Sequence, residues 1–206
     1  MKSILIEFLG KNGAGVSMTY EIAKSFANKG FDVYVLLSSK VLNRKQWEDI
    51  KIANMHMKFI DTGNKRTILQ KTVGFLFTKN KILREEKSIQ FDFALRTFPH
   101  PWLELIEKEL GIRKVFFILH DPLPHTGTQW YRKKIAKRSV DTATDIIVMS
   151  KKFISVVHDH YGIRRENIHY MRLGFLSATD VNNQSVDIDL TQFNDSIVNF
   201  VFFWKD

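Results

Sequence analysis

The 206-residue chain contains no cysteine. Disulfide bonds, thiolate metal sites and cysteine nucleophiles are therefore excluded. The N-terminus does not resemble a signal peptide, because the apolar run after Lys2 is short and no small-residue cleavage site follows it. No apolar stretch of the sequence reaches the length that is needed to cross a bilayer. We therefore expect a cytoplasmic protein.

Acidic residues are the minority among the charged ones, 22 against 31 Lys and Arg, so the formal net charge is +9. This surplus favours an anionic partner, which could be a sugar nucleotide, an anionic lipid or nucleic acid. Nucleic acid is the least favoured, because no helix-turn-helix, zinc-finger or RNP pattern accompanies the charge. The hydrophobic fraction of 44% is typical of a globular chain. The length predicts one large domain, or one domain with a piece of a second.

Residues 2–38 predict a strand, a glycine loop, a helix and a second strand. Residues 3–9 form a mostly apolar run that is typical of a buried parallel strand. Gly10, Gly13 and Gly15 follow, then an apolar stripe at helical spacing that stops at Gly30, then a strand at 31–37. The glycine loop opens the helix, so its backbone N–H groups and the positive end of the helix dipole suit an anion such as phosphate.

The glycine loop does not identify its ligand by itself. Val16-Ser17 stand where a triphosphate-binding loop requires Lys-Ser/Thr. The glycines also run G-x-x-G-x-G rather than G-x-G-x-x-G, and the second strand ends without an acidic residue for a ribose. A tight turn with a purely structural role is the alternative interpretation.

The rest of the chain alternates predicted strands and helices. The strands are expected at 56–60, 91–96, 114–119, 144–149 and 168–173, and the helices at 43–52, 65–77, 100–111, 129–140 and 150–162. This alternation predicts an α/β fold, a Rossmann-like parallel sheet with helices on both faces. The strand at 114–119 is the most apolar of these, so we expect it at the centre of the sheet.

The helix at 65–77 has an apolar face, which consists of Ile68, Leu69, Val73, Leu76 and Phe77. Positive charges flank that face at Lys71, Lys79, Lys81, Arg84 and Lys87. The favoured interpretation is a core helix with one solvated side. The alternative is a helix that presses basic and apolar side chains, including Phe75, against an anionic membrane surface.

His120 and Asp121 directly follow the apolar strand at 114–119. Ligands of an open parallel sheet bind beyond the carboxyl ends of its strands, so His120 is a candidate for binding or catalysis. The alternative is a loop histidine that hydrogen-bonds to the backbone. His158 and His160 lie two residues apart on a predicted helix and point in different directions. No metal site is predicted.

The last thirty residues differ from the rest of the chain. Residues 177–185 are polar and linker-like, whereas residues 197–204 form a strongly apolar strand that would aggregate without a partner. We therefore expect two parts, a first domain at 1–176 and, at 177–206, the linker and first strand of a second domain. That second domain would be missing or supplied by another chain.

The order of these segments resembles the N-terminal half of a GT-B glycosyltransferase, and in particular the retaining transferases of family four. The segments that carry the resemblance are the glycine loop, Gly30-Phe31-Asp32-Val33-Tyr34-Val35, Leu119-His120-Asp121, residues 145–150, Tyr161-Gly162, residues 168–174 and Phe202-Phe203-Trp204-Lys205. Each is weak alone, and their order and spacing carry the argument across almost the whole chain.

The resemblance implies roles for individual residues. His120 would be catalytic and would contact the transferred sugar and its phosphate oxygen. Gly13 and Gly15 would join His120 in binding the donor. Asn12, Asp121 and Thr126 would bind the acceptor. No cofactor is implied beyond the nucleotide sugar, which is a substrate.

The resemblance further implies retaining transfer of a sugar from a nucleotide-sugar donor to a carbohydrate or lipid-linked acceptor. Such an enzyme would make a cell-surface polysaccharide or a glycolipid, with an anionic membrane surface as a further partner at the inner face of the cell membrane. We expect the isolated chain to bind sugar nucleotide weakly and to transfer nothing. Two alternatives stay open: the acceptor subunit of a split glycosyltransferase, and a non-catalytic module that binds a phosphorylated ligand. No carboxylate pair suggests glycoside hydrolysis.

Overall fold

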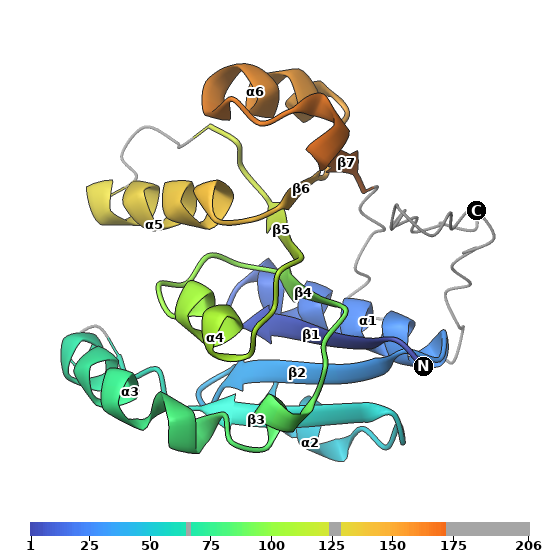
Figure 1. Cartoon of the computed structure of the whole chain (residues 1–206), viewed down its shortest axis with the longest axis vertical. Coiled ribbons are helices and arrows are strands. Elements are labelled where there is room, and N and C mark those ends of the chain that lie inside the picture. Colours follow the sequence, from blue (N-terminus) through green and yellow to red (C-terminus); the bar gives the residue numbers. More distant parts are fainter. Residues whose placement is uncertain (65–66, 124–128, 172–206) are drawn as a thin grey trace.

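The computed structural model describes residues 1–64, 67–123 and 129–171. Within these ranges, seven parallel strands form one sheet in the order β3-β2-β1-β4-β5-β6-β7 (Figure 1). The strands are β1 Ser3–Phe8, β2 Asp32–Ser38, β3 Met55–Ile60, β4 Phe93–Arg96, β5 Val115–Leu119, β6 Asp145–Val148 and β7 Ile168–Tyr170. The helices are α1 Ala14–Asn28, α2 Arg44–Asp49, α3 Ile68–Ile82, α4 Leu103–Glu109, α5 Trp130–Asp141 and α6 Lys152–Tyr161. The predicted Rossmann-like α/β fold is confirmed.

Helices cover both faces of the sheet because the strand side chains alternate between two apolar cores. Ile4, Ile6 and Phe8 of β1 pack into one core with the apolar stripe of α1. Leu5 points to the opposite face, where a second core contains residues of α3 and α4. A third core joins β5, β6 and β7 to α5 and α6. Burial on both faces explains why these strands are nearly continuous apolar runs.

The sheet changes its direction of growth between β1 and β4. The chain adds β2 and β3 on one side of β1, and β4 to β7 on the other. Connections that leave neighbouring strands in opposite directions open a crevice at the carboxyl edge, which is the usual ligand site of open α/β sheets. The glycine loop after β1 and the segment after β4 both begin at this point of the carboxyl edge. The centre of the sheet is β4, with β5 beside it, so the expectation that residues 114–119 are central is off by one strand.

The helix at 65–77 is the clearest departure from expectation. It runs from Ile68 to Ile82, and the predicted apolar face is exposed: Leu69 is 77% and Phe77 is 85% exposed. Phe75 is instead the buried residue of α3, where its ring stacks on Trp102 with centroids 4.4 Å apart. The interpretation of that face as a core face is therefore wrong. The predicted strand at 197–204 lies outside the described residues.

A charged group is buried between β1, β4 and α4. Arg96 donates two hydrogen bonds to Glu107, one of 2.6 Å from Nε, and two more of 2.9 and 2.8 Å to the Ser139 carbonyl and the Thr142 hydroxyl. Glu7 is fully buried beside this pair. Burial, and then the charge of Glu107, raises the pKa of Glu7 well above its usual range. This environment stabilises a neutral Glu7 carboxyl group.

Candidate active site

The mouth of α1 lies at the carboxyl edge of the sheet, as the glycine loop predicts. Gly13 precedes the helix with a φ of 92°, a backbone conformation that side chains other than glycine rarely adopt. No side chain caps this helix end, and its first turn contains no acidic residue. The first backbone N–H groups of α1, at the positive end of the helix dipole, therefore have no capping side chain.

Gly15 lies deeper than Gly13 and has a packing role. It is buried, and a Cβ atom there would lie 2.8 Å from Cε2 of Phe8 and 3.5 Å from Cδ2 of Phe98. A Cβ atom at Gly10 would lie 2.7 Å from the same Phe8 ring. The lack of a side chain at Gly10 and Gly15 thus leaves space for the aromatic rings that pack under the loop, whereas Gly13 is exposed to solvent. The donor-binding roles of Gly13 and Gly15 stay predictions.

His120 lies at the same edge as the glycine loop. Its Nε2 atom is 2.9 Å from the carbonyl oxygen of Thr97, and its ring centroid is 5.6 Å from that of Phe98. Because a carbonyl only accepts, Nε2 must carry a proton, which leaves Nδ1 as the nitrogen that can serve a ligand. The backbone bond expected of a loop histidine is therefore present, and it also orients the ring.

Two threonine hydroxyls connect the glycine loop to the His120 segment. The Oγ1 atom of Thr19 lies 2.6 Å from the Gly15 carbonyl and 2.8 Å from the Oγ1 atom of Thr97. Thr97 also bonds the carbonyl of Glu7 through its hydroxyl, at 3.0 Å, and through its backbone N–H, at 3.1 Å. All of these groups are buried. They fix the backbone whose carbonyl holds His120 relative to the first turn of α1.

The remaining predicted residues are less closely placed. Asn12 is exposed in the glycine loop, and Asp121 is exposed directly after His120. Both lie at the carboxyl edge, where an acceptor would approach, but their acceptor roles stay predictions. Thr126 lies outside the described residues. The catalytic role of His120 likewise stays a prediction.

Sequence reasoning missed Thr97 and Phe98, which join Gly15 to His120. A signal was available, because both residues directly follow the predicted strand at 91–96 and thus occupy the carboxyl end of an interior strand. The rule that selected His120 after the next strand applies to them equally. No sequence pattern marks Thr19, since its role depends on its contact with Thr97, which is distant in the sequence.

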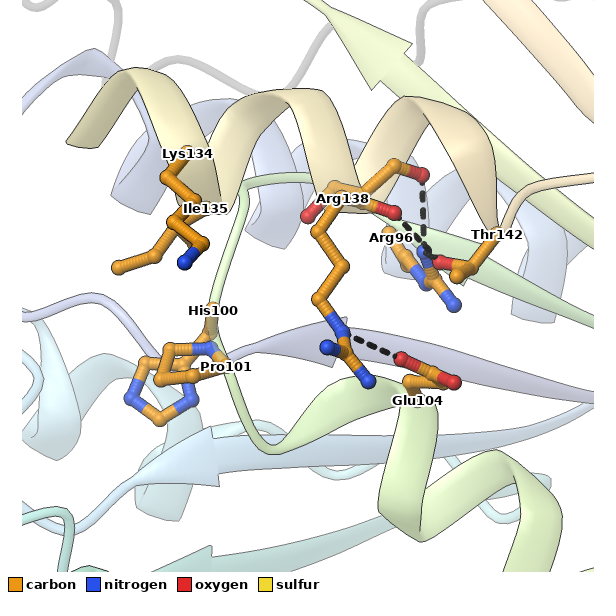
Figure 2. A pocket seen from close by; sticks show the side chains of 9 residues that line it. Arg96, His100, Pro101, Glu104, Lys134, Ile135, Arg138 and Thr142 are labelled. Atoms are coloured by element: carbon orange, nitrogen blue, oxygen red, sulfur yellow. Dashed lines mark hydrogen bonds and ion pairs between the residues drawn. The ribbon is translucent and has the colours of Figure 1, made fainter. Parts of the chain in front are cut away.

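A separate pocket of about 160 Å³ lies between α4 and α5. Figure 2 shows the Arg138–Glu104 ion pair, 2.7 Å long, crossing it between the two helices, with His100 and Pro101 to one side and Arg96 to the other. Burial, and then the positive charge of Lys11, lowers the pKa of His100 to about 4. The ion pair joins α4 and α5 across the pocket.

The fold has counterparts among solved structures. HepE of Anabaena, in complex with UDP, superimposes with a TM-score of 0.58 at 16% identity, over 85% of this chain and 44% of that one. UGT89C1 of Arabidopsis thaliana, also with UDP, gives 0.57 at 10% identity, over 82% and 51%. MurG of Acinetobacter baumannii gives 0.50 at 16% identity, over 72% and 41%. The chain therefore spans less than half the length of HepE and MurG.

Sequence comparison is more specific. None of the curated proteins matches this chain. The family model described as Glycosyltransferase Family 4 matches residues 12–175, which include Gly13, Gly15, Thr97 and His120. Because this match covers most of the chain, and the fold agrees with the N-terminal half of GT-B enzymes, the chain belongs to glycosyltransferase family 4.

Proposed function

We propose that this chain is the acceptor-side half of a retaining glycosyltransferase that uses a nucleotide-sugar donor. The proposal rests on one observation: the start of α1 and His120 lie at the same carboxyl edge of the sheet. Phe98 and the hydrogen-bonded hydroxyls of Thr19 and Thr97 connect them. Solved structures of HepE, which share this fold, contain UDP, and one contains UDP-glucose. In the proposal the nucleotide base is held by a second half.

The chemistry of transfer matches the groups at this crevice. As the glycosidic bond to the donor breaks, the anomeric carbon becomes positive and the diphosphate leaves with negative charge. Backbone N–H groups at the start of α1 can stabilise that charge, and one such donor is typically worth about 3 kcal/mol of barrier height. The Nδ1 atom of His120 can accept a hydrogen bond from a sugar hydroxyl, or, in the imidazolium form, donate one to a phosphate oxygen.

Several apolar side chains are exposed in segments that follow the carboxyl ends of the strands. Leu42, Leu69, Phe98, Leu123 and Trp130 are all exposed, and they come from segments near the carboxyl edge. Figure 1 shows that α3 and α5 extend past that edge on the same side of the molecule. No helix in the described part of the chain is both long and apolar enough to cross a bilayer. We propose that the acceptor is a glycolipid or growing polysaccharide at the cytoplasmic surface of an anionic membrane, and the exposed apolar side chains of α3 support contact of that helix with the membrane.

The test is saturation-transfer NMR of the 206-residue chain with UDP-glucose, GDP-mannose and ADP-glucose. We expect weak binding in which the sugar protons receive more saturation than the base protons, and no sugar transfer by the chain alone. His120→Ala should remove the sugar signal, whereas the control His160→Ala, on α6, should keep it. Saturation confined to the base, or an equal sugar signal in both variants, would contradict the proposal.

A further inference from the structure

Three lysines from three separate segments meet around one carboxylate at the carboxyl edge. The Nζ atom of Lys71, on α3, lies 2.7 Å from Oδ2 of Asp61, and that of Lys40, after β2, lies 3.9 Å from Oδ1. Lys11, in the glycine loop, donates to the carbonyl of Gly63. We call these residues the lysine cluster: Lys11, Lys40, Lys71 and Asp61. It adjoins the glycine loop on the β3 side.

The cluster is held by its own backbone as well as by charge. Gly63 donates its N–H to Oδ1 of Asp61 at 2.9 Å, and its φ of 71° turns the chain so that its carbonyl faces Lys11. Each lysine ammonium has three N–H donors. Among the described residues, Lys11 has one hydrogen-bond acceptor, Lys71 has the Asp61 carboxylate, and Lys40 is beyond hydrogen-bond distance of it. Donors therefore remain for a further anion.

The charges of the lysine cluster do not balance. Three ammonium groups face one carboxylate, which leaves a surplus of +2. A phosphate monoester carries about −1.5 to −2 at neutral pH, so a single such group would match the surplus. Lysine has a flexible side chain, and its ammonium group binds phosphate as a point charge. Arginine is favoured instead where a planar group must pair with a carboxylate. We propose that the lysine cluster binds a phosphate group of the acceptor, an assignment of the ligand to the acceptor that rests on the proposed function.

The lowered pKa of Lys11 agrees with a shortage of negative charge around its ammonium group. Partial burial, and then the neighbouring Lys40, lowers the pKa of the Lys11 ammonium, and Asp61 opposes this only in part. A bound phosphate would restore that pKa. The position agrees too, since Lys11 lies between Gly10 and Asn12 in the loop that borders the crevice. The phosphate group of the acceptor would thus bind next to the glycine loop, on its β3 side.

Inorganic pyrophosphate is the first probe, titrated into the chain while amide resonances are followed by NMR. Shifts at Gly63 and Lys71 report the lysine cluster, whereas shifts at Gly13 and Gly15 report the mouth of α1. Lys71→Met should weaken binding at the cluster about fivefold, the upper range for one exposed ion pair. Asp61→Asn should tighten it about threefold, because Asn keeps the oxygen that Gly63 bonds and removes the competing charge.

The exposed pair Lys137 and Asp141 on α5, 2.6 Å apart, supplies matched controls. Lys137→Met and Asp141→Asn change net charge as the cluster variants do, and should leave pyrophosphate binding at Gly63 unchanged. A second arm uses phosphatidylcholine vesicles with phosphatidic acid. If Lys71→Met weakens flotation with these vesicles, the phosphate is lipid-borne. If it weakens pyrophosphate binding alone, the acceptor is a soluble phosphorylated sugar.

Equal pyrophosphate binding in wild type, Lys71→Met and Asp61→Asn would overturn the phosphate site. So would variant effects that the α5 controls reproduce. The proposed function fails separately, through the sugar signal of UDP-glucose and its response to His120→Ala, which Lys71→Met should not change. A phosphate site without any sugar-nucleotide binding would overturn the assignment of that phosphate to an acceptor.

Discussion

The Nε2 atom of His120 lies 2.9 Å from the carbonyl oxygen of Thr97, which accepts but cannot donate a hydrogen bond. The neutral imidazole is therefore held as the tautomer with its proton on Nε2. A backbone partner of this kind cannot be removed by substituting the Thr97 side chain. The backbone at the carboxyl end of β4 thus sets the orientation of the ring, and Nδ1 is the nitrogen that a ligand can contact.

The tautomer of His120 is open to direct measurement. In ¹⁵N NMR spectra above neutral pH, Nε2 of His120 should have the shift of a protonated nitrogen and Nδ1 that of an unprotonated one. The exposed His160 should show the averaged shifts of an exchanging ring. The reverse pattern at His120, or averaging there, would contradict the geometry.

Gly15→Ala should destabilise the chain by about 1–3 kcal/mol, because its methyl group would overpack against Phe8 and Phe98. The same displacement should shift the NMR signals of the neighbouring His120 ring. Gly74→Ala is the matched control on α3, where an added Cβ meets nothing within 4 Å. That variant should gain about 0.5–1 kcal/mol from helix propensity. Urea denaturation of both variants measures the difference, and equal effects would show that the Gly15 packing is unimportant.

Exposed apolar side chains on α3 should mediate binding to anionic membranes. Wild type should float with vesicles of phosphatidylcholine and phosphatidylglycerol, less so at high salt. Phe77→Glu, at a side chain that is 85% exposed, should weaken this binding about tenfold or more without unfolding the protein. Thr78→Glu adds the same charge to the same helix and removes no apolar group, so it should weaken binding much less. Flotation that neither variant changes would exclude α3 as the contact.

Glu7→Gln should stabilise the protein at neutral pH. The pKa of the Glu7 carboxyl is raised in the folded state, whereas in the unfolded chain it is about 4.3. Between these values the native state holds one more proton than the unfolded state, so wild-type stability falls as pH rises. The advantage of Glu7→Gln in thermal denaturation should therefore shrink as pH is lowered to about 4. An advantage that does not vary with pH would contradict a neutral Glu7.

His100 should contribute the opposite pH dependence. Its pKa is about 4 in the folded state and roughly 6.5 in the unfolded chain. As pH falls through this window, the unfolded state takes up a proton that the native state does not, so stability is lost. Because the ring is partly exposed, we expect a loss of about 1–2 kcal/mol. His100→Asn, compared with wild type by urea denaturation at several pH values, should reduce that loss.

Local patterns in the sequence predicted most of the fold. Gly30, Gly111 and Gly162 end helices with positive φ, as their positions after apolar stripes suggested. The strands are correct to within a few residues because apolar runs of that length, bounded by turn residues, are buried on both faces. The placement of His120 at the carboxyl edge followed from the same reasoning.

Features that depend on contacts between distant segments were not predictable in this way. An apolar stripe on α3 indicates an amphipathic helix, but it does not reveal whether a partner covers it. The lysine cluster joins the glycine loop, the segments after β2 and β3, and helix α3. The bidentate pair of Arg96 and Glu107 depends on how α4 folds back after β4. Such contacts arise from the sheet order, which local sequence patterns do not contain.

The hydroxyl groups of Thr19 and Thr97 have two hydrogen atoms between them, yet they make three oxygen–oxygen contacts: with Gly15, with each other and with Glu7. One contact must therefore lack its hydrogen at any moment. Each hydroxyl can donate to its own carbonyl, which leaves the contact between the two threonines without a hydrogen. Alternatively, Thr97 donates to Thr19 and Thr19 to the Gly15 carbonyl, or the donation runs the opposite way and ends at the Glu7 carbonyl. The polarity of this short chain can thus reverse by rotation of two O–H bonds, with every heavy atom in place.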